Sequence, residues 1–202
     1  MCRWARRSWL FGFALLFCMP VHAASDLATA RRAYKDKDYA TAFKVLTPLV
    51  KKGNADAEVL LGRMYLMGHG VLKDQDEAYK LFKMAADQGS ADGEFFLGSK
   101  AVLSHVGLAE GLRWLRLSAG QGNQDAQLLL GQNYMRGLAG YLPRDPVKAE
   151  MWLTLAAKDN LPFYKMQLVD AERQMSPADI ARGKALAAAW KPQHGLKPTD
   201  KP

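Results

Sequence analysis

The side chains that could do chemistry in this chain are few, and their spacing favours structural roles. Beyond the N-terminal segment the histidines are His69, His105 and His194, and no two of them are close enough in sequence to form a ready-made pair of metal ligands. We expect histidines in solvent-exposed positions. Asp74 and Asp76 have the chemistry of an acid and a base. However, residues 74–77 read Asp-Gln-Asp-Glu, a helix-capping box that accounts for both carboxylates.

Short catalytic motifs are also missing from the sequence. It contains no Gly-x-Ser-x-Gly, no Ser-x-x-Lys, no phosphate-binding glycine loop and no His-Glu-x-x-His. We therefore predict no catalytic residues, no cofactor and no metal site, and we predict that the protein is not an enzyme.

The first 23 residues have the features of a secretory signal peptide. Three arginines precede the apolar run Trp9–Met19, which at eleven residues is well short of the roughly 20 that span a bilayer. Small residues follow at the positions that a signal peptidase reads, so we predict cleavage after Ala23 and a periplasmic or secreted protein. Two other export routes are considered. A twin-arginine signal at 5–10 is disfavoured by the strongly apolar leader, and lipidation of Cys18 is disfavoured by the bulky Phe17.

Charge and cysteine content restrict the partners of the exported chain. The chain has 28 basic and 20 acidic residues, and loss of the three leader arginines lowers its formal charge from +8 to +5. Both cysteines lie in the leader, so the mature chain would have neither disulfides nor thiolate ligands. Beyond the leader no basic run exceeds two residues, and aromatics are not interleaved with basic residues, so we expect no nucleic acid partner. No later stretch is apolar enough for a membrane span. A protein partner is expected, with an anionic envelope polymer as the alternative.

Two sequence blocks recur every 33 to 38 residues. The first block has the form small-x-x-x-Leu-Gly-x-x-aromatic, and its glycines are Gly62, Gly98 and Gly131. The second has the form small-x-x-apolar-x-x-x-small-Ala, and it starts at Ala78, Gly111 and Ala149. Both have helical periodicity, and length differences lie only in the connecting loops. Glycine lowers helix propensity by roughly 0.8 to 1 kcal/mol relative to alanine, so each Leu-Gly position predicts a close helix contact that offsets this cost.

These blocks resemble the Sel1-like repeat family, a relative of the tetratricopeptide repeat, over about residues 54–160. The second repeat departs from the family pattern at Ala101, Ser104 and Gly111, and its loop has no capping aspartate. The first repeat matches the pattern at Ala57, Leu61, Gly62, Tyr65, Gly68, Gly70, Val71, Asp74, Ala78, Ala85, Ala86 and Gly89.

The predicted fold is all-α, a right-handed α-solenoid of stacked antiparallel helix pairs. We expect an N-terminal capping helix pair at 24–53, three repeats at 54–160, two C-terminal capping helices at 161–190 and a disordered tail at 191–202.

The first helix of each repeat has a second row of side chains beyond those that the helix pair needs. Because these residues point away from the stripe at Ala57, Leu61 and Tyr65, stacking would align them as two apolar rows around a polar one. They are candidates for a groove that binds an extended peptide or a partner helix. The alternative is that neighbouring first helices bury them against each other. The candidate residues are Val59, Arg63, Leu66, Phe95, Ser99, Val102, Leu128, Gln132 and Met135.

The sequence thus predicts an exported, noncatalytic scaffold or adaptor that binds a protein partner. The family resemblance implies work in envelope assembly, secretion or the regulation of signalling. It also implies an alternative, a periplasmic hydrolase acting on cell-wall or β-lactam-type substrates, but the cysteines of the relatives linked to that activity are missing from the mature chain.

Overall fold

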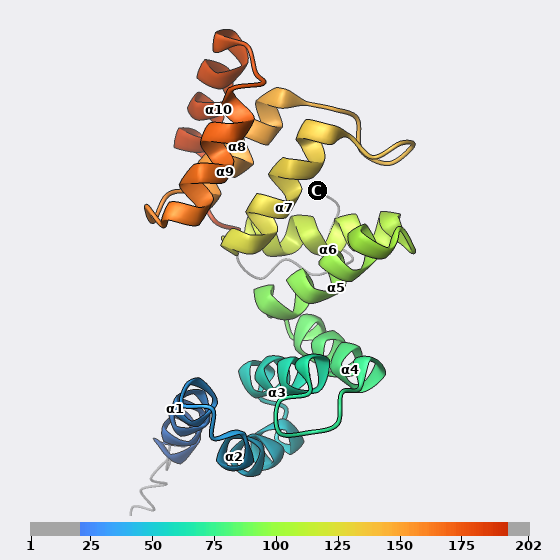
Figure 1. Ribbon diagram of the computed structural model, residues 1–202, viewed down its shortest axis with the longest axis vertical. Helices are drawn as coiled ribbons and strands as arrows, with labels where there is room; N and C mark the ends of the chain where they lie inside the picture. Colours follow the sequence, from blue (N-terminus) through green and yellow to red (C-terminus); the bar gives the residue numbers. More distant parts are fainter. Residues whose placement is uncertain (1–20, 194–202) are drawn as a thin grey trace, which may run out of the picture.

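The computed structural model describes residues 21–193, and these residues form an all-α helical repeat solenoid, as predicted (Figure 1). No strand occurs in this range; the only β-type pairing there is an isolated bridge between Leu138 and Leu142. The helices are α1 (Val21–Lys35), α2 (Tyr39–Lys51), α3 (Ala55–Met67), α4 (Gln75–Asp87), α5 (Ala91–Ser104), α6 (Leu108–Gly120), α7 (Gln124–Arg136), α8 (Pro146–Ala156), α9 (Pro162–Glu172) and α10 (Pro177–Ala189).

Most of the predicted signal peptide, residues 1–20, lies outside the described residues, as do residues 194–202 of the predicted tail. The proposed cleavage site after Ala23 falls in the first turn of α1. Cleavage and tail disorder therefore stay predictions.

Consecutive helices pack as pairs, and each pair packs on the next. Helices α1 and α2, α3 and α4, α5 and α6, and α7 and α8 are partners, and the second helix of each pair also contacts the first helix of the following pair. The stack rises from α1 and α2 at the bottom of Figure 1 to α7 and α8 near the top. The odd-numbered helices α1, α3, α5, α7 and α9 also touch in succession, and we call them the first helices.

Helix starts follow the capping signals in the sequence. The carboxylates of Asp74 and Asp145 and the hydroxyl of Ser176 each accept a hydrogen bond from a backbone N–H three residues later. The second repeat is the exception. Helix α6 starts after Gly107, which has a left-handed backbone and supplies no side-chain cap. The predicted departure of that loop from the family pattern is confirmed.

The Leu-Gly positions make the close contacts that the sequence predicts. A Cβ on Gly98 would lie 2.8 Å from the backbone nitrogen of Leu115 and 2.9 Å from the carbonyl oxygen of Gly111. At Gly62 and Gly131 the closest groups are the side chains of Phe82 and Leu153. Helices α5 and α6 therefore approach with backbone against backbone, closer than their counterparts.

A stacked aromatic pair connects the first repeat to the second. Phe82 of α4 is completely buried, and its ring lies parallel to that of Phe96 in α5 with 4.1 Å between centroids. Aromatic burial of this kind contributes large apolar area in a fixed geometry. The contact holds α4 against α5, which is the interface between two helix pairs.

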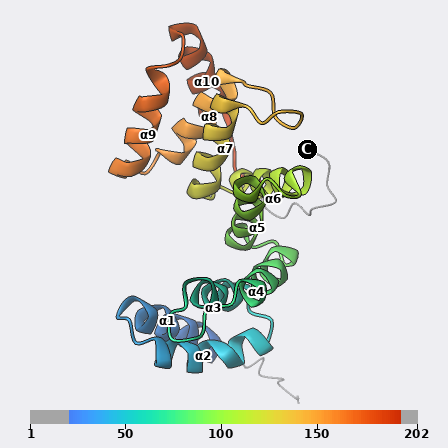
Figure 2. The same cartoon turned by 45° about the vertical axis from the view of Figure 1, so that its right-hand side comes forward.

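The last two helices do not form another regular pair. Helix α10 packs on α8, and a Cβ on Gly183 would overlap the side chain of Glu150. Helix α9 continues the row of first helices and contacts α7 and α8 (Figure 2). Its outward side chains Phe163, Met166 and Val169 remain about half exposed.

Candidate partner-binding surface

The structure divides the nine predicted groove residues between core and surface. Val59, Val102 and Leu128 are buried, with 5 to 8% of each exposed. Val59 packs in the cluster around Phe82, and Leu128 packs in a cluster with side chains of α9. These three residues therefore belong to the packing between helices and do not present a continuous apolar row to a ligand.

Four of the remaining candidates, together with Leu128, line one depression of about 420 Å³, which we call the central depression. It crosses α3, α4, α5, α7 and α9, and apolar side chains dominate its lining. The predicted residues on it are Leu66, Phe95, Ser99, Leu128 and Gln132, and the others are Tyr79, Phe96, Lys100, Leu103, Asp125, Leu129 and Phe163.

Two of these additional lining residues are the most available for contact with a partner, because their side chains are exposed. Leu103 has 73% and Phe163 has 54% of its surface accessible. Phe163 was not among the predicted residues because it belongs to the segment expected to cap the stack; α9 lies beside α7 and continues the row of first helices. The spacing offered a signal for the helix, because α9 starts 38 residues after α7, the step between the second blocks of the last two repeats.

A second hollow of about 320 Å³ lies nearer the N-terminal end, and we call it the N-terminal depression. Val59 and Arg63 line it together with Arg31 and Tyr34 of α1. The ninth candidate, Met135, is half-buried and packs against the core cluster of α5 to α8. The predicted single groove is therefore two neighbouring depressions along the first helices.

Aspartates at equivalent positions of α3, α5 and α7 each bond to a neighbouring repeat. Asp56 pairs with Arg31 at 3.0 Å, Asp92 accepts a hydrogen bond from the Asn123 side chain at 2.7 Å, and Asp125 accepts one from the Tyr164 hydroxyl at 2.7 Å. Burial, helped by the bond to Asp125, raises the pKa of Tyr164 to about 12, so this hydroxyl stays a donor at neutral pH. These carboxylates hold adjacent repeats together.

Lys100 and Arg63, unlike Arg31, lie against aromatic rings on this surface. The Lys100 ammonium lies 3.8 Å from the centroid of the Tyr79 ring, and the Arg63 guanidinium lies 5.7 Å from that of Tyr34. Neither Lys100 nor Arg63 forms an ion pair within residues 21–193. Both positive charges therefore face solvent without a carboxylate partner.

Three buried polar side chains at the repeat interfaces were not among the predicted site residues. Glu58, Glu94 and Gln127 occupy equivalent positions of α3, α5 and α7, and all are fully buried. One oxygen of each glutamate accepts a hydrogen bond at 2.8 Å from the Nε2 of Gln88 or Gln121, and the other has no partner. Burial raises the pKa of Glu58 and raises that of Glu94 to about 7. The regular spacing of these three polar residues was the signal in the sequence.

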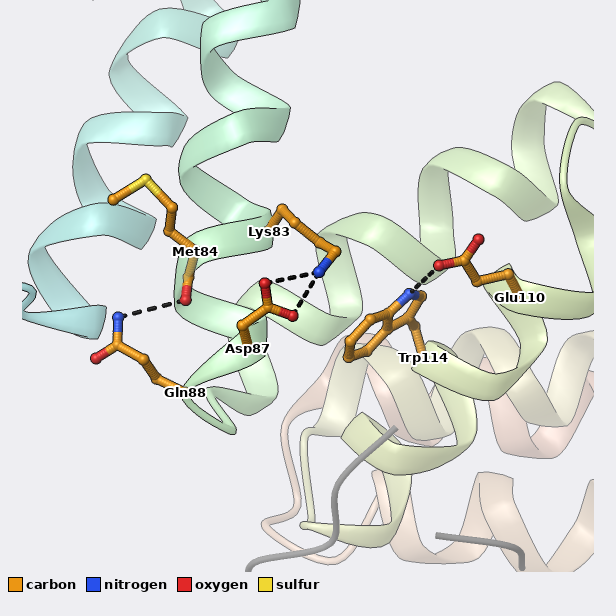
Figure 3. Close-up of polar contacts among 6 residues, drawn as sticks. All are labelled: Lys83, Met84, Asp87, Gln88, Glu110 and Trp114. Carbon is orange, nitrogen blue, oxygen red and sulfur yellow. Dashed lines mark hydrogen bonds and ion pairs between the residues drawn. The ribbon is translucent and has the colours of Figure 1, made fainter. Parts of the chain in front are cut away.

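A further polar cluster lies where α4 meets α6 (Figure 3). The Trp114 indole donates to Glu110 at 3.3 Å, and Lys83, which lies 5.6 Å from the Trp114 ring, pairs with Asp87. The polar groups of this cluster are thus satisfied by one another. The Lys83–Trp114 contact is the one among these that joins the first repeat to the second.

His69 and His105 lie in different loops, the first after α3 and the second after α5. His69 is half-buried, its ring stacks on Tyr39 with 4.7 Å between centroids, and its Nδ1 lies 3.0 Å from the Tyr34 hydroxyl. The expectation of a solvent-exposed side chain was wrong for His69, because the loop that carries it folds back on α1 and α2. His105 is exposed, and His194 lies outside the described residues. Within the described range no three His, Cys, Asp or Glu side chains group as metal ligands.

Comparison with known proteins agrees with the repeat assignment. The family model described as the Sel1 repeat matches residues 55–90, 107–123 and 124–161. The middle match covers α6 but not α5, the half of the second repeat in which Ala101 and Ser104 depart from the pattern. No curated protein matches the chain.

Two solved structures share the fold. A Sel1 repeat protein from Oxalobacter formigenes is 26% identical with a TM-score of 0.60, over 70% of this chain and 59% of that one. A protective antigen present in uropathogenic Escherichia coli strains, which displays an SLR fold, is 20% identical with a TM-score of 0.53, over 89% of this chain and 50% of its own. This chain thus covers 50 to 59% of the length of these two structures.

Stacked helix pairs with close Leu-Gly contacts define an α-solenoid of the helical-repeat class. The chain is a Sel1-repeat protein. Proteins of this family are typically scaffolds for protein interactions. No helix within residues 21–193 is long and apolar enough to cross a membrane.

Proposed function

We propose that the protein is an exported, noncatalytic scaffold that binds a protein partner through the first helices, at the central depression. The exposed apolar side chains there carry the proposal. Leu103 and Phe163 come from different helices, lie at one hollow and have most or about half of their surface accessible. Contiguous exposed apolar surface of this kind marks interaction sites in soluble proteins.

The N-terminal sequence supports the cellular setting of this proposal. A leader with basic residues before a short apolar run, followed by a chain without cysteines, fits export to the periplasm or beyond. In that setting the scaffold would serve envelope assembly, secretion or the regulation of signalling.

The double variant Leu103→Ser, Phe163→Ser tests the interaction surface. Each apolar anchor of an interface typically contributes about 1 to 2 kcal/mol or more, so the variant is expected to capture the partner at least tenfold less well in a crosslinking pull-down from periplasm. Its melting temperature should stay close to that of the parent, because both side chains are already exposed.

Leu72→Ser is the matched control, since Leu72 is 90% exposed and lies outside both depressions. Capture by the control should equal that of the parent. A double variant that captures the partner as well as the control does would place the binding surface elsewhere.

A further inference from the structure

We propose that the segment bound at the first helices is an acidic, apolar peptide segment of the partner, whose carboxylates pair with Arg63 and Lys100 and whose apolar side chain enters the central depression. This inference rests on the proposed function and adds the chemistry of the partner.

The acidic groups of this surface are already engaged. Asp56, Asp92 and Asp125 each hold a donor from a neighbouring repeat at 2.7 to 3.0 Å. A basic segment that drew these carboxylates toward itself would pull them away from Arg31, Asn123 and Tyr164. This would weaken the contacts between repeats, so we expect a basic segment to be disfavoured.

The cationic groups are available. Lys100 is exposed and sits over Tyr79, and burial raises the pKa of the Tyr79 hydroxyl, so this ring stays neutral and does not neutralise the lysine. Arg63 is exposed over the Tyr34 ring. A ring holds a cation in place but leaves its N–H donors free, and an arginine offers five of them in a fork that fits a carboxylate.

One short segment can reach both cations. Arg63 lies on α3 and Lys100 on α5, two first helices in contact with each other. An extended peptide advances about 3.3 Å per residue, so a short segment that crosses from α3 to α5 can present one acidic side chain to each cation. The apolar residue beside the second acidic side chain would meet Leu103 and Phe163.

The apolar lining decides between a peptide and an anionic polymer. Lys100 is the one cation on the central depression, and its neighbours there are mostly leucine and aromatic side chains. A polysaccharide or phosphate chain would present repeated charge and little apolar surface to them. A peptide with both kinds of side chain fits both features.

The test uses the full chain and two pools of fluorescent synthetic twelve-residue peptides of equal apolar content, one acidic and one basic. We expect the acidic pool to bind at least tenfold more tightly by fluorescence anisotropy, and to lose this advantage as salt is raised, because the charges are exposed. In the variant Arg63→Glu, Lys100→Glu the preference should reverse. The matched control Lys44→Glu, Lys158→Glu makes the same charge change at exposed lysines away from both depressions, and it should keep the preference for acidic peptides.

Several results would overturn the inference: binding of neither pool, a preference for the basic pool, or a preference that Arg63→Glu, Lys100→Glu leaves unchanged. Dextran sulfate that displaces the acidic peptides and binds Leu103→Ser, Phe163→Ser as well as the parent would favour an anionic polymer instead. The proposed function fails separately. Basic peptides that bind the parent and lose binding in Leu103→Ser, Phe163→Ser would overturn only the charge assignment, whereas partner capture unaffected by that variant would overturn the proposed function itself.

Discussion

Replacing Gly98 with leucine is expected to destabilise the protein by about 3 kcal/mol, because the new side chain would enter a contact between two backbones. The first added atom would already lie 2.8 Å from the Leu115 nitrogen and 2.9 Å from the Gly111 oxygen. Neither atom can rotate away, so α5 and α6 must separate. Thermal unfolding followed by circular dichroism measures the loss, and it should outweigh the gain in helix propensity that leucine brings.

Alanine at two helical glycines gives the matched comparison. A Cβ on Gly120 would meet only the Gln193 side chain, at 3.7 Å, so Gly120→Ala should stabilise by about 0.8 to 1 kcal/mol. Gly98→Ala makes the same chemical change at the close contact and should destabilise. If both alanine variants melt above the parent, the inferred close packing of α5 on α6 is wrong.

Glu94→Gln is expected to stabilise the protein at pH 8 by about 2 kcal/mol, with solvent screening allowed for. The pKa of Glu94 is raised from an ordinary 4.5 to about 7 in the folded state, so the folded state holds the proton more tightly than the unfolded state. Between about pH 4.5 and 7 the carboxyl group is ionised in the unfolded state but still mostly protonated in the folded state. The free energy of unfolding therefore falls as pH rises through this range, and it levels off above it. Glutamine carries no charge and lacks this penalty.

The third repeat indicates that an amide suits this position. Gln127, the counterpart of Glu94, donates its Nε2 to the Ala119 carbonyl at 3.1 Å. Melting temperatures of parent and variant between pH 5 and 8 measure the effect, with Asp76→Asn as a control at an exposed carboxylate. The difference between parent and Glu94→Gln should grow with pH. A constant difference would mean that Glu94 does not titrate in this range.

Local signals in the sequence predicted much of the fold. Caps at Asp74, Asp145 and Ser176 begin helices where expected, because the bond that they make spans only three residues. Gly62 and Gly98 mark helix contacts because few other features make glycine advantageous inside a helix. Helix caps and glycine contacts each involve only one helix and its partner, so the helical periodicity of the sequence is enough to predict them.

The candidate surface was predicted less completely because it depends on how successive pairs are rotated. Helical periodicity places Val59 and Leu128 away from the partner helix, but it does not specify that they join clusters formed by that helix together with α5 or α9. Likewise, amphipathic spacing identified the last two helices without indicating that α10 would turn back onto α8 and leave Phe163 at the central depression.

The central claim is that the partner binds at the central depression, and site-specific photo-crosslinking in cells tests it most directly. A photoreactive amino acid at Leu103 samples the depression, and one at Leu186 on α10 is the control, since Leu186 is 46% exposed and lies outside it. We expect a discrete protein adduct from position 103 and none from position 186. A discrete adduct from position 186 with none from position 103 would contradict the claim.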